Sequence, residues 1–140
     1  MVVDLRYACD SSQVFENMKF VKHRNKWFWG HSTIIIAENG CAVCTVQFDK
    51  DFKNEAIVCG VSVFQGARNK GYGNLLLKEA EKEARHFKAK QLVLYAERTS
   101  WTKDWYIRHG FIEMPPIQSG QIIGGESADE KMCELRKPLD

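Results

Sequence analysis

The hydrophobic pattern of the chain alternates between short apolar segments and one long amphipathic segment. The short segments are rich in β-branched residues and are bounded by polar or glycine-containing turns, which is typical of β-strands. The predicted strands cover residues 2–7, 32–37, 41–48, 56–64, 91–96 and 131–139. Because both hairpins and a helical crossover join these strands, we expect a mixed α/β sheet.

The amphipathic segment, residues 74–87, is the strongest helix candidate. It is rich in Leu, Ala, Glu and Lys, which favour helices. Apolar residues recur in it at helical spacing, so one face of the helix is expected to pack on the sheet. These residues are Leu76, Ala80, Ala84 and Phe87.

The rest of the pattern predicts an N-terminal helix, a hairpin and a long loop. Asp10 and Gln13 resemble a capping box at a helix start. The apolar residues that follow share one helical face: Val14, Phe15, Met18 and Val21. Asn39-Gly40 is a strong hairpin signal. Residues 114–129 are rich in Pro, Gly and Ser and indicate a loop.

Candidate chemistry lies at the junction between the strand at 56–64 and the helix at 74–87, where the sequence reads Arg-Asn-Lys-Gly-Tyr-Gly over residues 68–73. A glycine-rich turn that opens a helix presents main-chain N–H groups to a phosphate. Arg68 and Lys70 add positive charge. This junction therefore indicates a pyrophosphate site, although a turn that merely joins a strand to a helix has the same local sequence.

Two better-known phosphate loops do not fit this junction. Gly66 and Gly71 have P-loop spacing, but Tyr72-Gly73 stands where Lys-Ser or Lys-Thr is required. The dinucleotide-binding fingerprint also fails, because Gly71-Tyr72-Gly73 is followed by no third glycine. A nucleoside triphosphate or a dinucleotide is therefore disfavoured as the ligand.

Two motifs and the order of elements across the whole chain resemble the GNAT superfamily of acetyl-CoA-dependent N-acyltransferases. Its signature Arg/Gln-x-x-Gly-x-Gly/Ala is matched by Arg68, Gly71 and Gly73. A second signature, a short helix that ends in Tyr-x-x-x-Gly-Phe, is matched by residues 106–111. The resemblance implies a single α/β domain over residues 1–140. It implies a mixed, mostly antiparallel sheet of about six to seven strands, helices on both faces, and a splay between the fourth and fifth strands.

The resemblance also implies how acetyl-CoA is held as co-substrate. The main chain of Val61, Ser62 and Val63 is expected to align the thioester and the pantetheine arm. The pyrophosphate is expected to be held by Arg68, Asn69, Lys70, Gly71, Tyr72, Gly73 and Asn74. Thr99 stands where the family tends to have an asparagine that contacts this arm, and Thr102 stands where it tends to have a small alanine. These departures affect the grip on the pantetheine arm and not the fold.

Transfer of the acetyl group to an amine needs an acid and a base. By resemblance Tyr106 is the acid, since a tyrosine of pKa about 10 is protonated at neutral pH and can donate to the departing thiolate. A tyrosine that only packs at the end of a helix is the plainer alternative. Ile57 stands at the commonest position of the family's base and cannot serve. Glu55, on the same strand face, and Glu97, at the end of the fifth strand, are the remaining candidates.

Composition restricts the other classes of function. The net charge of +2 gives no global reason to expect nucleic acid or a membrane surface. The N-terminus lacks the apolar core of a signal peptide. Five cysteines, an odd number, favour reduced thiols and a cytoplasmic protein. Cys41 and Cys44 diverge if they lie in a strand, and the histidines form no ligand grouping, so we expect no metal.

The acceptor is not specified by these patterns. The aromatic run Trp27-Phe28-Trp29 fits either a pocket wall or core, and Trp101 and Trp105 are expected to pack beside Tyr106. The sequence favours an N-acetyltransferase that acts on a small amine, an amino-terminal group or a protein lysine, and leaves a homodimer open. The alternative is an acyl-CoA-binding or interaction module without catalysis, which Ile57 and Thr99 suggest.

Overall fold

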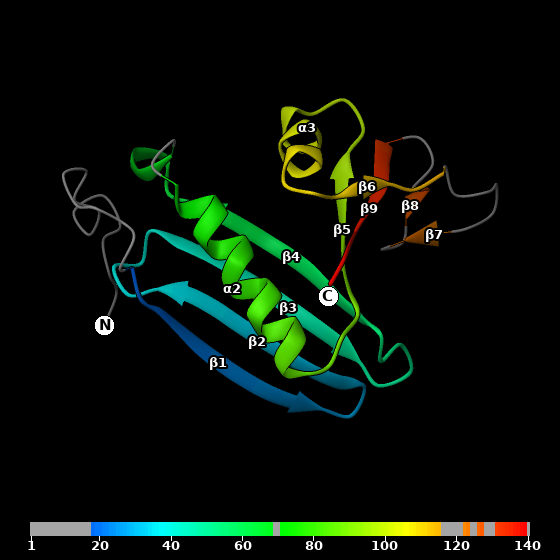
Figure 1. Cartoon of the computed structure of the whole chain (residues 1–140), viewed down its shortest axis with the longest axis horizontal. Helices are drawn as coiled ribbons and strands as arrows, with labels where there is room; N and C mark the ends of the chain where they lie inside the picture. Colours follow the sequence, from blue (N-terminus) through cyan, green and yellow to red (C-terminus); the bar gives the residue numbers. More distant parts are fainter. Residues whose placement is uncertain (1–17, 69–70, 116–121, 124–125, 128–130, 140) are drawn as a thin grey trace.

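The computed structural model describes residues 18–68, 71–115, 122–123, 126–127 and 131–139. Its main element is a seven-stranded sheet of order β1-β2-β3-β4-β5-β9-β6 (Figure 1). These strands are β1 (Phe20–Trp27), β2 (Gly30–Ala37), β3 (Ala42–Asp49), β4 (Glu55–Val63), β5 (Gln91–Glu97), β6 (Ile112–Glu113) and β9 (Met132–Pro138). The other elements are α2 (Tyr72–His86), α3 (Trp101–Arg108), a short 3₁₀ helix (Gln65–Ala67) and the strand pair β7 (Ile122–Ile123) and β8 (Glu126–Ser127).

Strand pairing confirms the predicted mixed, mostly antiparallel sheet. Every neighbouring pair in the main sheet is antiparallel except β4 and β5, which run parallel. The β4–β5 pairing covers only Glu55–Gln91, Ala56–Leu92 and Ile57–Val93. Beyond these pairs the two strands diverge (Figure 1), so the predicted splay is confirmed as well.

The core lies between the sheet and α2. The apolar face of α2 is buried through Leu76, Leu77, Ala80 and Ala84, as its spacing predicts. In β3 the alternate residues Ala42, Cys44, Val46 and Phe48 are buried, and Phe87, directly after α2, packs its ring on Phe48 with centroids 4.5 Å apart. The helix therefore rests on the centre of the sheet.

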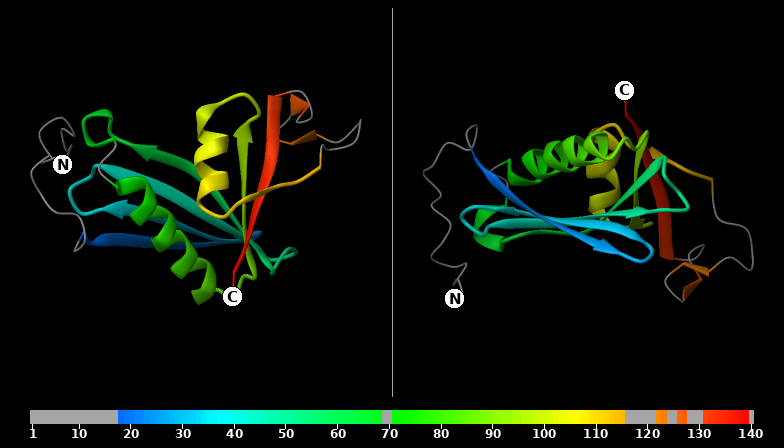
Figure 2. Two further views of the ribbon diagram at one scale, coloured as in Figure 1. Left: turned by 45° about the horizontal axis from the view of Figure 1, so that its top comes forward. Right: turned by 90° about the horizontal axis from the view of Figure 1, so that it is seen from below.

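The second helix, α3, lies on the same side of the sheet as α2 (Figure 2). Trp105 and Tyr106 of α3 pack against the core cluster. Within the described residues no helix covers the opposite face of the sheet, and the helix that the sequence predicts from Asp10 starts outside them. The two described helices and the splayed sheet thus enclose one side of the molecule.

The N-terminal part of the pattern was the least well predicted. The strand expected at residues 2–7 lies outside the described residues. Val21, placed on a helical face by its spacing, lies instead in the edge strand β1, which pairs with β2 along its whole length. Long-range pairing with β2 decided the conformation here, because a short apolar spacing fits both kinds of element.

The β2–β3 turn agrees with its sequence signal, whereas one cysteine does not behave as expected. Gly40 has φ +76° and closes the β2–β3 hairpin through its N–H to Ala37 O (2.8 Å), which confirms the Asn-Gly turn. The expectation of reduced thiols is wrong for Cys41, which is disulfide-bonded, whereas Cys44, Cys59 and Cys133 are free.

A buried carboxylate attaches α2 to the edge of the sheet. Glu83 is fully buried and accepts two hydrogen bonds of 2.7 Å from Arg24 of β1 and one of 2.7 Å from Thr33 of β2. Burial alone would raise the pKa of the Glu83 carboxyl, but these hydrogen bonds and the charges of Arg24 and Lys22 outweigh it and hold the pKa below its ordinary value. The ion pair thus fixes how α2 sits over β1 and β2.

We expect Arg24→Ala to lower the urea midpoint of unfolding at neutral pH, because it leaves the buried Glu83 carboxylate with less compensation. Without the hydrogen bonds and charge of Arg24, burial raises the folded-state pKa of Glu83 relative to wild type. This penalty disappears as the pH falls through that raised pKa, and the difference from wild type should narrow towards pH 4. Urea denaturation at several pH values measures it.

Lys82→Ala is the control, since Lys82 forms an exposed ion pair with Glu79 (3.3 Å). It should cost less than about 1 kcal/mol. A deficit in Arg24→Ala that stays constant from neutral pH to pH 4 would contradict the assigned role of Glu83.

Candidate active site

A β-bulge in β4 turns the end of this strand toward the helices. The register between β3 and β4 shifts between Thr45–Cys59 and Val43–Ser62. Gly60 lies inside the shift and has φ +62°, a left-handed conformation. Before the bulge Val58 is buried, and after it Val61 and Val63 pack on the core cluster. The bulge therefore changes which residues of β4 face α2 and α3.

The main chain of β4 beyond the bulge has no strand partner on one side. Its pairing with β5 ends at Ile57, while its pairing with β3 continues to Val63. On the side toward β5, no described strand takes the hydrogen-bonding groups of Val61, Ser62 and Val63. Such an edge can pair with an extended ligand as a strand would.

The N-terminus of α2 lies opposite this edge. Gly71 is the residue before the helix, has φ +88° and provides no side-chain cap. The first helical hydrogen bond runs from Leu75 N–H to Gly71 O (3.1 Å), so the N–H groups of Gly73 and Asn74 have no partner within the helix. A Cβ on Gly71 would meet nothing within 4 Å. Asn69 and Lys70, the other two residues of the turn, lie outside the described residues.

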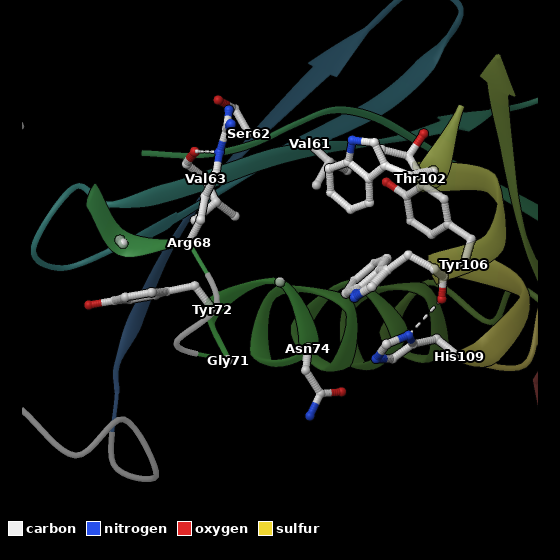
Figure 3. Close-up of a pocket in the computed structure, with 14 residues that line it drawn as sticks. Val61, Ser62, Val63, Arg68, Gly71, Tyr72, Asn74, Thr102, Tyr106 and His109 are labelled. Carbon is white, nitrogen blue, oxygen red and sulfur yellow. Dashed lines mark hydrogen bonds between the residues drawn. The ribbon is translucent and has the colours of Figure 1, made fainter. Parts of the chain in front are cut away.

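Tyr72 attaches this turn to the core of the protein. Its side chain is buried in the core, and its hydroxyl accepts a hydrogen bond from Asn39 Nδ2 (2.6 Å). Asn39 belongs to the β2–β3 hairpin, so the turn is tied to a rigid part of the sheet. The side chain of Tyr72 points away from α3 (Figure 3), which leaves its main chain for a ligand.

Gly73 lines the pocket and also lies where α2 and α3 meet. In the structure a Cβ at this position would lie 3.1 Å from the ring of Trp105. Gly73 therefore allows α3 to pack closely on α2, which brings Tyr106 toward β4.

These elements enclose one pocket of about 570 Å³ (Figure 3). In Figure 3 Arg68 and Gly71 lie at one end, and Thr102 and Tyr106 lie at the other. The residues that line the pocket are Val61, Ser62, Val63, Ala67, Arg68, Gly71, Tyr72, Gly73, Asn74, Trp101, Thr102, Trp105, Tyr106 and His109. The structure thus brings together two motifs that are far apart in the sequence.

Tyr106 projects from α3 into this pocket (Figure 3). Its ring packs edge-on against Trp105 (5.1 Å) and Phe111 (5.5 Å). Burial, and to a smaller extent the neighbouring Cys44, raise the pKa of Tyr106 above its ordinary value. The phenol is therefore protonated at neutral pH, as a proton donor must be.

Three other candidates lie apart from the pocket lining. Glu55 is at the start of β4, where its carboxylate accepts hydrogen bonds from Arg136 Nη1 (2.6 Å) and Gln91 Nε2 (3.4 Å). Six residues of strand, about 20 Å at about 3.3 Å per residue, separate Glu55 from Val61. Glu97 and Thr99 are exposed at the end of β5 and in the turn that follows it.

The aromatic residues are distributed differently from the sequence expectation. Trp27 and Phe28 are neither core nor pocket wall: they are 50% and 89% exposed at the β1–β2 hairpin. Trp105 packs, as expected, but Trp101 is 69% exposed. His109 was missed by sequence reasoning. It lines the pocket and its Nδ1 lies 2.8 Å from Trp105 O. Its place in the second motif, next to Gly110, was the one available signal.

The comparison with family models agrees with this geometry. The model described as an acetyltransferase (GNAT) domain matches residues 30–113, more than half of the 140-residue chain. The chain belongs to the GNAT acetyltransferase family. The predicted family is thereby confirmed, and with it the general prediction of an acyltransferase. A search of the curated proteins finds no match.

Solved GNAT structures share the fold of this chain at low sequence identity. A GNAT acetyltransferase from Elizabethkingia anophelis with acetyl-CoA bound is 16% identical, with a TM-score of 0.66 over 89% of this chain and 99% of that one. A Bacillus subtilis acetyltransferase in complex with CoA is 13% identical, with a TM-score of 0.62 over 87% and 100%. Nourseothricin acetyltransferase is 16% identical, with a TM-score of 0.61 over 86% and 85%.

Among the described residues, no three His, Cys, Asp or Glu side chains form a group that could hold a metal ion. No described helix is both long and apolar enough to cross a membrane.

The bulge offers a direct test of how the site is built. We expect Gly60→Ala to destabilise the protein by about 1–2 kcal/mol, because Cβ is disfavoured at φ +62°. The nearest atom to that Cβ, Thr45 Oγ1, is 4.0 Å away, so steric overlap adds little. Gly60→Asn is the matched control and should lose less, since Asn tolerates this conformation. Urea denaturation compares the two variants, and an equal loss in both would contradict conformational strain as the cause.

Proposed function

We propose that this GNAT domain is an N-acetyltransferase that transfers the acetyl group of acetyl-CoA to a primary amine of a small molecule, a peptide N-terminus or a protein lysine. The observation that carries the proposal is one pocket that joins an unpaired strand edge, an uncapped helix N-terminus and a protonated tyrosine. CoA and acetyl-CoA in two structural neighbours support the choice of ligand.

The phosphate end of the proposed ligand fits the turn before α2. The N–H groups at a helix N-terminus and the helix dipole both favour an anion. Arg68 is exposed beside the turn, with Nε 3.4 Å from Val63 O, so its guanidinium is near enough to assist. We assign the pyrophosphate to Arg68 through Asn74, mostly through main-chain groups.

The thioester end fits the edge of β4. Val61, Ser62 and Val63 offer main-chain groups to the pantetheine arm, and an N–H there can stabilise the oxyanion that forms when the amine nitrogen attacks the thioester carbon. When the carbon–sulfur bond breaks, the electron pair goes to sulfur, and Tyr106 gives the thiolate its proton. The raised pKa of Tyr106 keeps that proton available.

Removal of the proton from the amine is assigned to water. An alkyl amine of pKa about 10.4 is mostly protonated at neutral pH and must lose a proton before it attacks. Among the described residues that line the pocket there is no carboxylate. Glu55 and Glu97 remain candidates for the final acceptor, and each would have to act through a chain of water molecules.

Direct attack by the amine is favoured over an acetylated cysteine. Burial raises the pKa of Cys44 to about 12 and that of Cys59 above its ordinary value, so both remain thiols at neutral pH. A protonated thiol is a weak nucleophile.

A module that binds acyl-CoA without catalysis is the second candidate. The separation of Glu55 and Glu97 from the pocket lining favours it. Tyr106 favours the enzyme, because binding alone requires no proton donor. The effect of a Tyr106 substitution on turnover distinguishes the enzyme from the binding module.

Gly71→Glu tests the phosphate site. The new carboxylate would stand at the α2 N-terminus, repel the pyrophosphate and accept the same N–H groups, so we expect acetyl-CoA to bind at least about 100-fold more weakly in calorimetry. Gly71→Asn, which tolerates positive φ and is neutral, is the control and should bind within about tenfold of wild type. Absence of acetyl-CoA binding by the wild type would overturn the proposed function. Equal binding by all three proteins would place the pyrophosphate elsewhere.

Tyr106→Phe tests the chemistry. Thiol release from acetyl-CoA should be followed with a panel of primary amines, and the best acceptor compared between wild type and variant. We expect turnover to fall about 100-fold, the low end for loss of a general acid, while the dissociation constant of acetyl-CoA stays within about twofold. Because the pKa of Tyr106 is raised, wild-type activity should show no loss from its ionisation below pH 10. Unchanged turnover in the variant would remove Tyr106 from the mechanism.

A further inference from the structure

Trp101 is an exposed aromatic residue that lines the pocket. It is the first residue of α3 and is 69% exposed. Like Tyr106 of the same helix, it lines the pocket. An indole in water forgoes the burial that makes tryptophan favourable in a fold. The other exposed aromatic side chains of the described chain, Trp27, Phe28 and Phe52, lie outside the pocket lining.

Trp105 shows what a packing tryptophan looks like in the same helix. Its ring stacks on His109 at 4.1 Å, meets Tyr106 at 5.1 Å and lies against Gly73. No aromatic ring of the described residues packs on Trp101. Its exposed ring therefore contributes little to the fold and leaves an aromatic face open to a ligand in the pocket.

The main chain at Trp101 is held by the turn that precedes it. Ser100 donates its N–H (3.1 Å) and its hydroxyl (3.0 Å) to Glu97 O, at the end of β5. The hydroxyls of Ser100 and Thr102 lie 2.6 Å apart. The residues on both sides of Trp101 are thus tied to each other and to the sheet, so the indole stands on a rigid base.

The surroundings of Trp101 indicate an uncharged ligand segment. Trp101 lines the pocket and is followed in the sequence by Thr102. Thr102 and Tyr106 lie at the end of the pocket opposite Arg68 and Gly71 (Figure 3). Val61 of β4 and Thr102 provide neutral surface there. The part of acetyl-CoA that is uncharged and extended is the pantetheine arm, whereas the charges of the ligand lie in its phosphates.

We propose that the indole of Trp101 covers the pantetheine arm next to the thioester and holds it against the edge of β4. This inference rests on the proposed function and adds a residue that determines how tightly the arm is bound. Trp101 stands one residue before Thr102, where this chain has a bulkier side chain than the alanine that is usual in the family. The indole supplies apolar contact that the threonines at 99 and 102 do not.

Calorimetry with three ligands tests the role of Trp101. For Trp101→Ala we expect acetyl-CoA and CoA to bind about tenfold more weakly, since the apolar contact is lost. Adenosine 3′,5′-bisphosphate keeps the adenosine, the 3′-phosphate and one phosphate of the pyrophosphate but has no pantetheine arm, so its affinity, measured by displacement of acetyl-CoA, should not change. Trp101→Phe keeps an aromatic face and should bind acetyl-CoA within about threefold of wild type.

Trp27→Ala is the matched control, because Trp27 is half exposed at a hairpin outside the pocket. Its affinity for all three ligands should equal that of wild type. Acetyl-CoA should also protect the tryptophan fluorescence of the wild type from acrylamide, and this protection should be smaller in Trp101→Phe. The melting temperature of Trp101→Ala should stay near that of wild type, since an exposed side chain is removed.

The outcomes separate this inference from the proposed function. If wild type binds acetyl-CoA and Trp101→Ala binds it equally well, the inference is overturned and the proposed function stands. If the variant loses affinity for adenosine 3′,5′-bisphosphate to the same extent, Trp101 acts on the phosphate site and the inference is again overturned. If wild type binds no acetyl-CoA, both proposals fail.

Discussion

The early end of pairing between β4 and β5 is the constraint on which the site depends. Parallel strands normally satisfy their main-chain groups along a common edge, yet here pairing stops after Ile57 and Val93. The rest of β4 keeps β3 as a partner on one side and has an open edge on the other. That edge can accept an extended ligand only because the strands separate, so the splay is what turns a sheet into a binding site.

Two glycines determine how the end of β4 and helix α3 are positioned at the pocket, each by a different physical effect. Gly60 adopts a left-handed conformation that most residues resist, and the resulting bulge turns Val61 and Val63 toward the helices. Gly73 removes a side chain that would overlap Trp105 and so lets α3 approach α2. Tyr106 reaches the pocket as a result of both. The site is therefore shaped by main-chain geometry more than by reactive side chains.

The charges of the molecule are arranged so that the pocket holds few of them. The buried Glu83 is neutralised by Arg24 at the far side of α2, and Glu55 is paired with Arg136. The described pocket lining carries Arg68 at one end and Tyr106, with a raised pKa, at the other. This polarity supports the proposed ligand, which has charged phosphates at one end and a neutral thioester at the other.

Local signals in the sequence determined the hairpin at Asn39-Gly40, the helix α2, most strands and the two motifs, because turn chemistry and hydrophobic spacing act over a few residues. The family followed from those motifs, which the structure brings together around one pocket. The strand β1 was missed, since Val21 fits a helix or a strand until β2 pairs with it. Only the tertiary structure decided that Gly73 serves helix packing, that Glu55 is held by Arg136 and that Trp101 stays exposed. Each of these depends on contacts between segments far apart in the chain, which local spacing does not encode.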